Sequence, residues 1–200
     1  MHYVGGKYRI GKEIADIIKL YSPTEYGEYL ECFCGALGVL RHMTNTYICE
    51  ASDYHPDLIQ LWKDVQNDTF EYPDKMDINI YNQSKKLKSP SSLKGFIGFG
   101  CSYGGRYYGG YVEKYSNNQV EIQSSIKAIK KIKNNIKKVK FSCKLYNEWK
   151  PVNKIIYADP PYYREDNVLL YRRGKKYEFF DNKEFWNIMR EWSKSNIVYI

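Results

Sequence analysis

The stretch Lys154-Ile155-Ile156-Tyr157-Ala158-Asp159-Pro160-Pro161-Tyr162 decides the fold. Its mostly apolar first half predicts a buried strand, and the two prolines end that strand because proline has no N–H to donate to a sheet. In open α/β sheets ligands bind beyond the carboxyl ends of the strands, so a site is expected here. A carboxylate and an unused carbonyl can both accept from an amino group, and an aromatic ring can stack on a base. The alternative is a strand-terminating turn with an incidental acid.

Strands and helices alternate on both sides of this stretch. Further strands are predicted over 28–33, 46–51, 139–145 and 196–200. Helices are predicted over 8–20, 37–43, 56–65, 119–138 and 182–194 from apolar residues spaced by three or four. In the first helix this spacing places Ile10, Ile14, Ile17 and Ile18 on one face. The alternation predicts an α/β fold with a mostly parallel, doubly wound sheet.

Residues 66–118 differ in character from the rest of the chain. Prolines interrupt the periodicity, and seven glycines lie between Gly95 and Gly110 among aromatic residues. We therefore expect an insertion with little regular structure. Its Arg106 could read guanine or a phosphate, and the alternative is a packed, irregular loop. The lysines of helix 119–138 are either a solvated face or a surface that follows phosphates.

The composition limits the class of protein. The formal net charge is +8 and the pI is about 9.0. This fits a polyanionic partner, although a lysine-rich genome would give the same balance. The chain has five cysteines, an odd number, and no C-x-x-C pair. This pattern indicates reduced thiols and argues against both a disulfide framework and a metal site. No signal sequence or membrane-spanning stretch is evident, so a cytoplasmic location is expected.

Two weaker patterns lie near predicted strand ends. Glu31-Cys32-Phe33-Cys34-Gly35-Ala36-Leu37-Gly38 runs from a strand into a glycine turn, where a nucleotide-like ligand could approach the backbone. Asp53 follows the next strand and is well placed to accept from ribose hydroxyls. Taken alone, an ordinary βα turn and a helix cap explain these two features equally well.

Taken together, five segments in order resemble the Dam-type N6-adenine DNA methyltransferases, a family with many phage members and enzymes of restriction-modification systems. The segments are Tyr3-Val4-Gly5-Gly6-Lys7, Phe33-Cys34-Gly35, Asp53-Tyr54-His55-Pro56-Asp57-Leu58-Ile59, Phe99-Gly100-Cys101-Ser102-Tyr103-Gly104-Gly105-Arg106 and Asp159-Pro160-Pro161-Tyr162. The resemblance implies an enzyme that transfers a methyl group from S-adenosylmethionine (SAM) to N6 of an adenine flipped out of double-stranded DNA. It also implies a Rossmann-like methyltransferase sheet with an inserted DNA-recognition region.

The resemblance assigns roles to individual residues. Lys7 would pair with the SAM carboxylate, Asp53 would hold the ribose, and Asp159 with the Pro160 carbonyl would hold the target N6. Tyr162 would stack on the flipped base beside Pro161. The remaining cofactor contacts would come from Tyr3, Gly6, Phe33, Cys34, Gly35 and again Asp159, and the DNA contacts from Tyr103, Arg106, Tyr107 and Lys114. No metal is implied.

The resemblance also divides the chain. Residues 1–65 and 119–200 would form the two halves of the catalytic domain, and 66–118 the target-recognition region. His55 stands where the family commonly has Asn, and Leu145 where relatives often have an acid near the cofactor adenine. The chain ends inside the fifth predicted strand, so the last strands of the family sheet are expected to be missing. The chain would then be a fragment, one part of a split methylase completed by a C-terminal polypeptide, or a weakly active DNA- and SAM-binding remnant. An RNA or protein amide methyltransferase is a further alternative.

Overall fold

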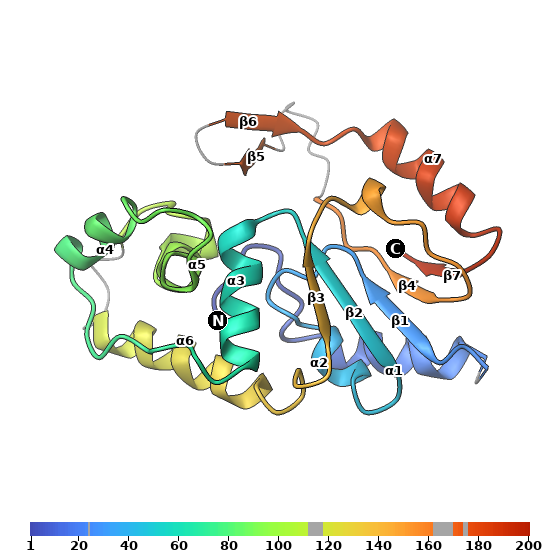
Figure 1. Cartoon of the computed structure of the whole chain (residues 1–200), viewed down its shortest axis with the longest axis horizontal. Helices are drawn as coiled ribbons and strands as arrows, with labels where there is room; N and C mark the ends of the chain where they lie inside the picture. Colours follow the sequence, from blue (N-terminus) through green and yellow to red (C-terminus); the bar gives the residue numbers. More distant parts are fainter. Residues whose placement is uncertain (24, 112–117, 162–169, 174–175) are drawn as a thin grey trace.

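The structure, a computed structural model, describes residues 1–23, 25–111, 118–161, 170–173 and 176–200. It has seven α-helices and seven strands in these ranges (Figure 1). The helices are α1 (Gly11–Tyr21), α2 (Leu40–Met43), α3 (Pro56–Gln66), α4 (Ile78–Ser84), α5 (Ser92–Gly100), α6 (Asn118–Ile132) and α7 (Asn182–Trp192). The strands are β1 (Glu28–Glu31), β2 (Ile48–Asp53), β3 (Lys140–Cys143), β4 (Ile155–Tyr157), β5 (Leu170–Arg173), β6 (Lys176–Phe179) and β7 (Ile197–Tyr199).

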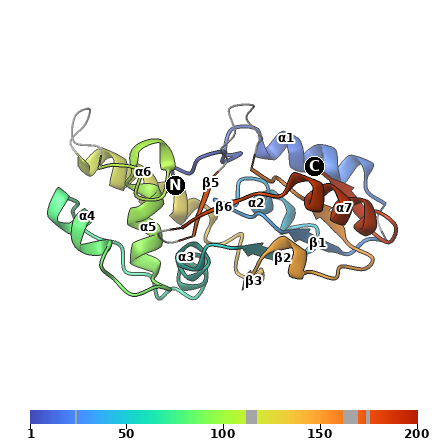
Figure 2. The same ribbon diagram turned by 90° about the horizontal axis from the view of Figure 1, so that it is seen from above.

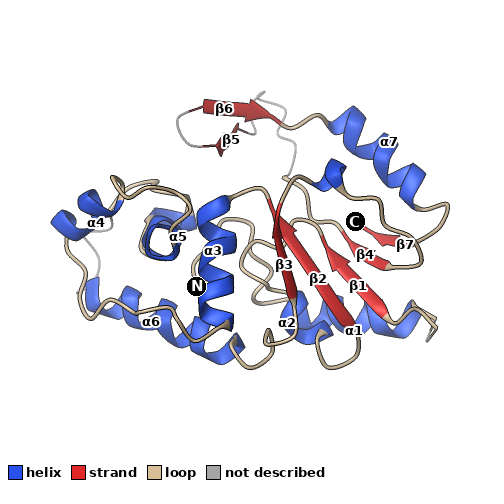
Figure 3. Ribbon diagram, viewed as in Figure 1, coloured by secondary structure: helices blue, strands red, loops and turns tan. Residues whose placement is uncertain are grey.

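Five of the strands form one parallel sheet in the order β3-β2-β1-β4-β7 (Figure 3). The predicted α/β fold with a parallel, doubly wound sheet is therefore confirmed. Strand order reverses between β1 and β4, which are neighbours although the chain visits β2 and β3 between them. At such a reversal the connections leave in opposite directions and open a crevice beyond the carboxyl ends of the strands. The fold thus predicts a site at the ends of β1 and β4.

Helices cover both faces of this sheet. Tyr29 of β1 belongs to a core that also contains Ala15 and Ile18 of α1, while the next residue, Leu30, packs in a second core with α7. Successive strand residues point to opposite faces, so α1 and α7 lie on opposite sides of β1. None of the helices in the described ranges is both long enough and apolar enough to cross a membrane.

The 66–118 region contains more regular structure than expected, and the prediction of an irregular insertion is wrong. It holds α4 and α5, and Figures 1 and 2 show them grouped with α6 at the end of the molecule beyond α3. Side-chain caps start both helices: Asp77 accepts from the Ile80 N–H at 2.8 Å, and Ser91 accepts from the Lys94 N–H at 3.2 Å. A Cβ at Gly95 would overlap the backbone of α3, so this glycine permits close helix packing.

Two helices differ from prediction in face or length. In α1 the buried residues are Gly11, Ala15 and Ile18, whereas Ile17 is 53% exposed and Ile10 47% exposed. The helix turns its small residues inward because a Cβ at Gly11 would overlap the Gly38 carbonyl. Helix α6 ends at Ile132, six residues before the predicted end. The β5–β6 hairpin, an antiparallel pair, was not predicted from the sequence.

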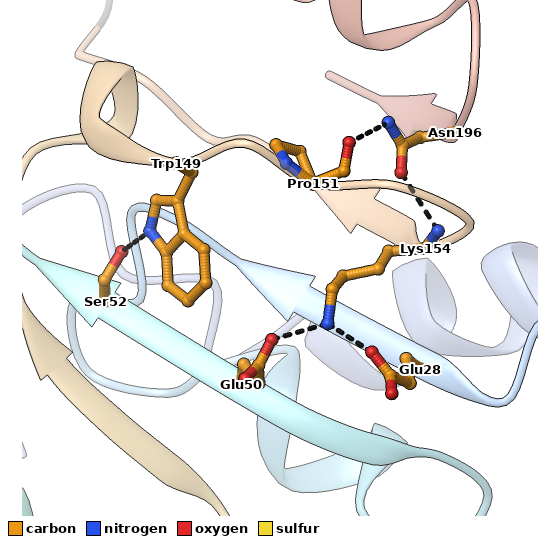
Figure 4. Close-up of polar contacts among 7 residues, drawn as sticks. All are labelled: Glu28, Glu50, Ser52, Trp149, Pro151, Lys154 and Asn196. Carbon is orange, nitrogen blue, oxygen red and sulfur yellow. Dashed lines mark hydrogen bonds and ion pairs between the residues drawn. The ribbon is translucent and has the colours of Figure 1, made fainter.

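A polar cluster fixes the start of β4 beneath the site (Figure 4). The Lys154 ammonium pairs with Glu28 at the start of β1 and, at 2.6 Å, with Glu50 of β2. The Asn196 side chain accepts from the Lys154 backbone N–H at 3.0 Å and donates to the Pro151 carbonyl at 2.9 Å. These contacts tie β4 to β1, β2 and the start of β7 and so set where its carboxyl end emerges.

Candidate functional site

The candidate site lies where strand order reverses. Glu31 at the end of β1 is in register with Tyr157 at the end of β4 and with Ala51 of β2. The segments that follow β1 and β4 therefore leave the sheet side by side. They are the turn around Gly35 and the Asp159-Pro160-Pro161 segment, which the sequence predicted as site elements from different parts of the chain.

Asp53 holds the turn that follows β1. Its Oδ2 accepts from the Gly35 N–H at 3.1 Å and its Oδ1 from the His55 N–H at 3.0 Å. The Trp62 indole donates to the Gly35 carbonyl at 2.9 Å, so the turn is held from both sides. Burial raises the pKa of Asp53 to about 6 against the opposing effect of these hydrogen bonds. The Asp53 carboxyl group is thus held in place at the site by backbone hydrogen bonds.

The Tyr3–Lys7 segment joins the site elements. The Lys7 ammonium lies 2.5 Å from Asp159 Oδ2 and 3.0 Å from the Gly5 carbonyl. Both side chains of this ion pair are largely buried, with 16% and 19% of their surface exposed. The Gly6 N–H donates to the Tyr3 carbonyl at 3.1 Å and closes the turn. The structure thereby brings together the two ends of the predicted site.

Gly35 must be glycine for two reasons. Its φ is +44°, a left-handed conformation that side chains disfavour. A Cβ there would also lie 2.8 Å from Cε1 of Tyr3. The Tyr3 ring packs on Phe99 with centroids 5.0 Å apart, so it cannot easily move away. The turn and the Tyr3–Lys7 segment are therefore fitted to each other.

The side chains of two other predicted cofactor residues lie away from the Lys7–Asp159 ion pair and the Gly35 turn. Phe33 is half-buried in an aromatic cluster, with ring centroids 5.2 Å from Tyr146 and 6.0 Å from Phe185. The Cys34 side chain is only 2% exposed and belongs to the core. Its backbone, whose N–H donates to the Ser52 carbonyl at 2.9 Å, remains the part that borders the turn.

The predicted DNA-contacting residues lie beside the Tyr3–Lys7 segment. The Gly105 carbonyl accepts from the Val4 N–H at 3.2 Å, and the neighbouring Arg106 is exposed. Tyr103 is 67% exposed, whereas Tyr107 is half-buried and donates to Asp57 Oδ2 at 2.6 Å. The first two side chains are thus available at the surface, and the third is engaged with α3. Lys114 and Tyr162 lie outside the described residues.

His55 links the site to the α4–α5 region. Its ring packs against Phe99 and Tyr107, with centroids 5.0 and 4.2 Å away. Its buried Nδ1 has no hydrogen-bond partner among the described residues. Burial lowers the pKa of His55 to about 4, so the ring is neutral near pH 7. Buried polar groups are usually hydrogen-bonded, so this nitrogen close to Asp53 is a polar group that a bound ligand could contact.

Glu31 begins the glycine-turn segment that the sequence analysis singled out, but no role was predicted for its side chain. The residue is 3% exposed at the end of β1, and its carboxyl accepts from the Tyr29 hydroxyl at 2.9 Å. A signal was present in the sequence, because an acid stands directly before Cys32-Phe33 inside an otherwise apolar run. Acids are seldom fully buried without a partner, so such a position suggests function.

Comparison with known proteins agrees with this geometry. Residues 3–98 match the D12 class of N6 adenine-specific DNA methyltransferases. The match includes Lys7, the Gly35 turn and Asp53, and it ends before Arg106 and Asp159. A comparison with curated proteins gives no significant match.

Proposed function

We propose that this chain, whose residues 3–98 match the D12 class of N6 adenine-specific DNA methyltransferases, moves the methyl group of SAM to N6 of an adenine flipped out of double-stranded DNA. The observation that carries this proposal is the Lys7–Asp159 ion pair at the reversal of strand order. Lys7 lies within the segment that matches the family, whereas Asp159 lies outside it. Their contact joins the Asp159-Pro160-Pro161 segment to the part of the chain that matches the family.

The residues present fit SAM. Lys7 supplies a cation for the amino-acid carboxylate, and the left-handed turn at Gly35 allows close approach to the backbone. Asp53 supplies an acid at the end of β2, where ribose hydroxyls bind in dinucleotide-binding sheets. The unsatisfied Nδ1 of His55 offers one more polar contact nearby. We assign Tyr3, Gly6 and the backbone of Cys34 to the same proposed cofactor site, with Phe33 at its margin.

Asp159 and Pro160 would hold the target amino group. The lone pair of an adenine N6 is delocalised into the ring, which makes the nitrogen a poor nucleophile. Two acceptors, the Asp159 carboxylate and the Pro160 carbonyl, would bind its two hydrogens and favour a pyramidal nitrogen. When bound, SAM supplies an electrophilic methyl group to that nitrogen. A base inside the stack cannot reach this position, so flipping is required at a cost of a few kcal/mol.

The α4–α5 region would recognise DNA. Arg106 is exposed on a loop whose neighbour, Gly105, is hydrogen-bonded to the Tyr3–Lys7 segment. A side chain on this loop therefore lies near the place where the flipped adenine would enter. We propose residues 66–118 as the recognition region and residues 1–65 and 119–200 as the catalytic domain. Tyr103 would contact the DNA beside Arg106, while Lys114 and Tyr162 keep the roles that the family resemblance gives them.

The test is methyl transfer from radiolabelled SAM to DNA of mixed sequence, with identification of the methylated nucleoside. The wild-type chain should produce N6-methyladenine. Asp159→Asn should reduce transfer by at least a hundredfold, and Glu13→Gln, a substitution of an exposed acid of α1 away from the proposed cofactor and DNA contacts, should leave it unchanged. Label recovered in RNA, in protein, or in another base would refute the proposed substrate. Full activity of Asp159→Asn would remove Asp159 from the mechanism.

A further inference from the structure

The Glu31 carboxyl has no role in the chemistry described above, yet it lies under the site. It ends the central strand β1, between β2 and β4, and only 3% of the residue is exposed. The site elements therefore surround a carboxyl group that water barely reaches. Glu31 ends β1 at the reversal of strand order, and the segment that follows it leads directly into the turn at Gly35.

The surroundings of Glu31 favour its neutral form. Burial is the main effect and raises the pKa of Glu31 to about 8, while hydrogen bonds from the Tyr29 hydroxyl and the Leu40 backbone N–H act in the opposite direction. The Asp159 carboxylate raises the pKa further, and the Lys7 ammonium lowers it. The other titratable groups that interact with Glu31 from its own strand, the following turn and β2 are Tyr29, Cys32, Cys34 and Cys49. Near pH 7 the carboxyl thus keeps its proton.

A cation brought into the site would change this balance. The positive charge of Lys7 lowers the pKa of Glu31, and a second cation in the site is expected to act in the same direction. SAM carries a sulfonium in addition to its ammonium and carboxylate and has net charge +1. The product S-adenosylhomocysteine has lost the sulfonium and is neutral overall. The two compounds therefore differ at the site by one positive charge.

Building on the proposed function, we propose that Glu31 determines specificity for the charged methyl donor over the neutral product: binding of SAM drives the buried carboxyl to release its proton to solvent, and the resulting carboxylate stabilises the sulfonium. Product binding leaves the carboxyl protonated. The proton balance is simple, since one carboxylic acid becomes one carboxylate and one solvent proton. After methyl transfer the carboxylate regains its proton, which weakens binding of the product and favours its release.

The experiment is calorimetric titration of the full chain with SAM and with S-adenosylhomocysteine at pH 7.5, in phosphate and in Tris. These buffers differ in ionisation enthalpy, so the difference in measured heat gives the number of protons released. We expect the wild-type chain to release a proton, in substantial fraction, with SAM and much less with the product. Glu31→Gln should abolish the difference and weaken SAM binding by about tenfold, while product binding changes less than about twofold. Glu13→Gln, the same substitution at an exposed acid of α1, should behave as wild type.

Tyr29→Phe gives a readout that does not depend on removing the carboxyl. It deletes a hydrogen bond that lowers the pKa of Glu31, so the pH at which SAM releases the proton should move upward. Equal proton release with both compounds in the wild-type chain would overturn the Glu31 proposal while leaving the proposed function intact. A wild-type chain that binds neither compound would overturn both. If Glu31→Gln fails to fold, Tyr29→Phe assigns the proton: an upward shift of the release profile relative to the wild-type chain supports Glu31, and an unshifted profile overturns the proposal.

Discussion

Gly35→Ala tests how tightly the Tyr3–Lys7 segment is fitted to the turn after β1. The left-handed backbone should cost about 1–2 kcal/mol for a residue with a Cβ. The new methyl group would lie 2.8 Å from Cε1 of Tyr3, and overpacking of this kind costs about 1–3 kcal/mol. We therefore expect Gly35→Ala to lower the free energy of unfolding by about 2–5 kcal/mol and to weaken SAM binding in parallel.

Gly104→Ala is the matched control, because Gly104 has a φ of +61° and open space where its Cβ would be. It should show only the backbone strain, about 1–2 kcal/mol. Urea unfolding measures both variants, and the slopes should remain equal if the unfolded states are alike. Adding Tyr3→Ala to Gly35→Ala should recover the part of the loss caused by the clash. Equal losses in the two glycine variants, with no recovery in the double variant, would refute the fitted contact.

Three further predictions concern the support of the site and its DNA contact. Lys154→Met leaves the Glu50 carboxylate without its partner and should reduce the free energy of unfolding by about 1–3 kcal/mol. Adding Glu50→Gln should restore part of this stability, and no restoration would show that the ion pair contributes little. Trp62→Phe removes the 2.9 Å hydrogen bond to the Gly35 carbonyl and should cost about 1–3 kcal/mol in the same measurement, so an unchanged unfolding midpoint would contradict a supporting role. Arg106→Ala should weaken DNA binding but not SAM binding, and if Arg106 contacts a phosphate the salt slope should fall by about one; equal DNA affinity would exclude the contact.

The sheet could be predicted because each of its strands carries a local pattern. The apolar run before Asp159 predicts the strand β4, and the apolar spacing over 56–65 predicts the helix α3. The structure confirms both elements. The α4–α5 region could not be predicted in the same way. Its glycines suggested an irregular loop, but Gly95 lies in a helix that packs closely on α3, and only the tertiary arrangement reveals this.

For the candidate site, too, the individual residues could be predicted from the sequence, whereas the contacts between them could not. The sequence and its family resemblance identified Lys7, Gly35, Asp53 and Asp159 one by one. They did not reveal that Asp53 accepts from the Gly35 N–H or that Lys7 pairs with Asp159, since these contacts join distant parts of the chain. The inward face of α1 was missed for a similar reason, because the close approach of another backbone at Gly11 decides it.

The Lys7–Asp159 pair also has a consequence for folding. The two residues are 152 positions apart, so their contact closes a very long loop. Contacts of high sequence separation form slowly because the chain must lose much entropy before they contribute. During synthesis β1, β2 and the Asp53–Gly35 contact can form well before β4 is available to pair with β1. The proposed cofactor side of the site is thus assembled early, and the group proposed to hold the target base is added only when β4 enters the sheet.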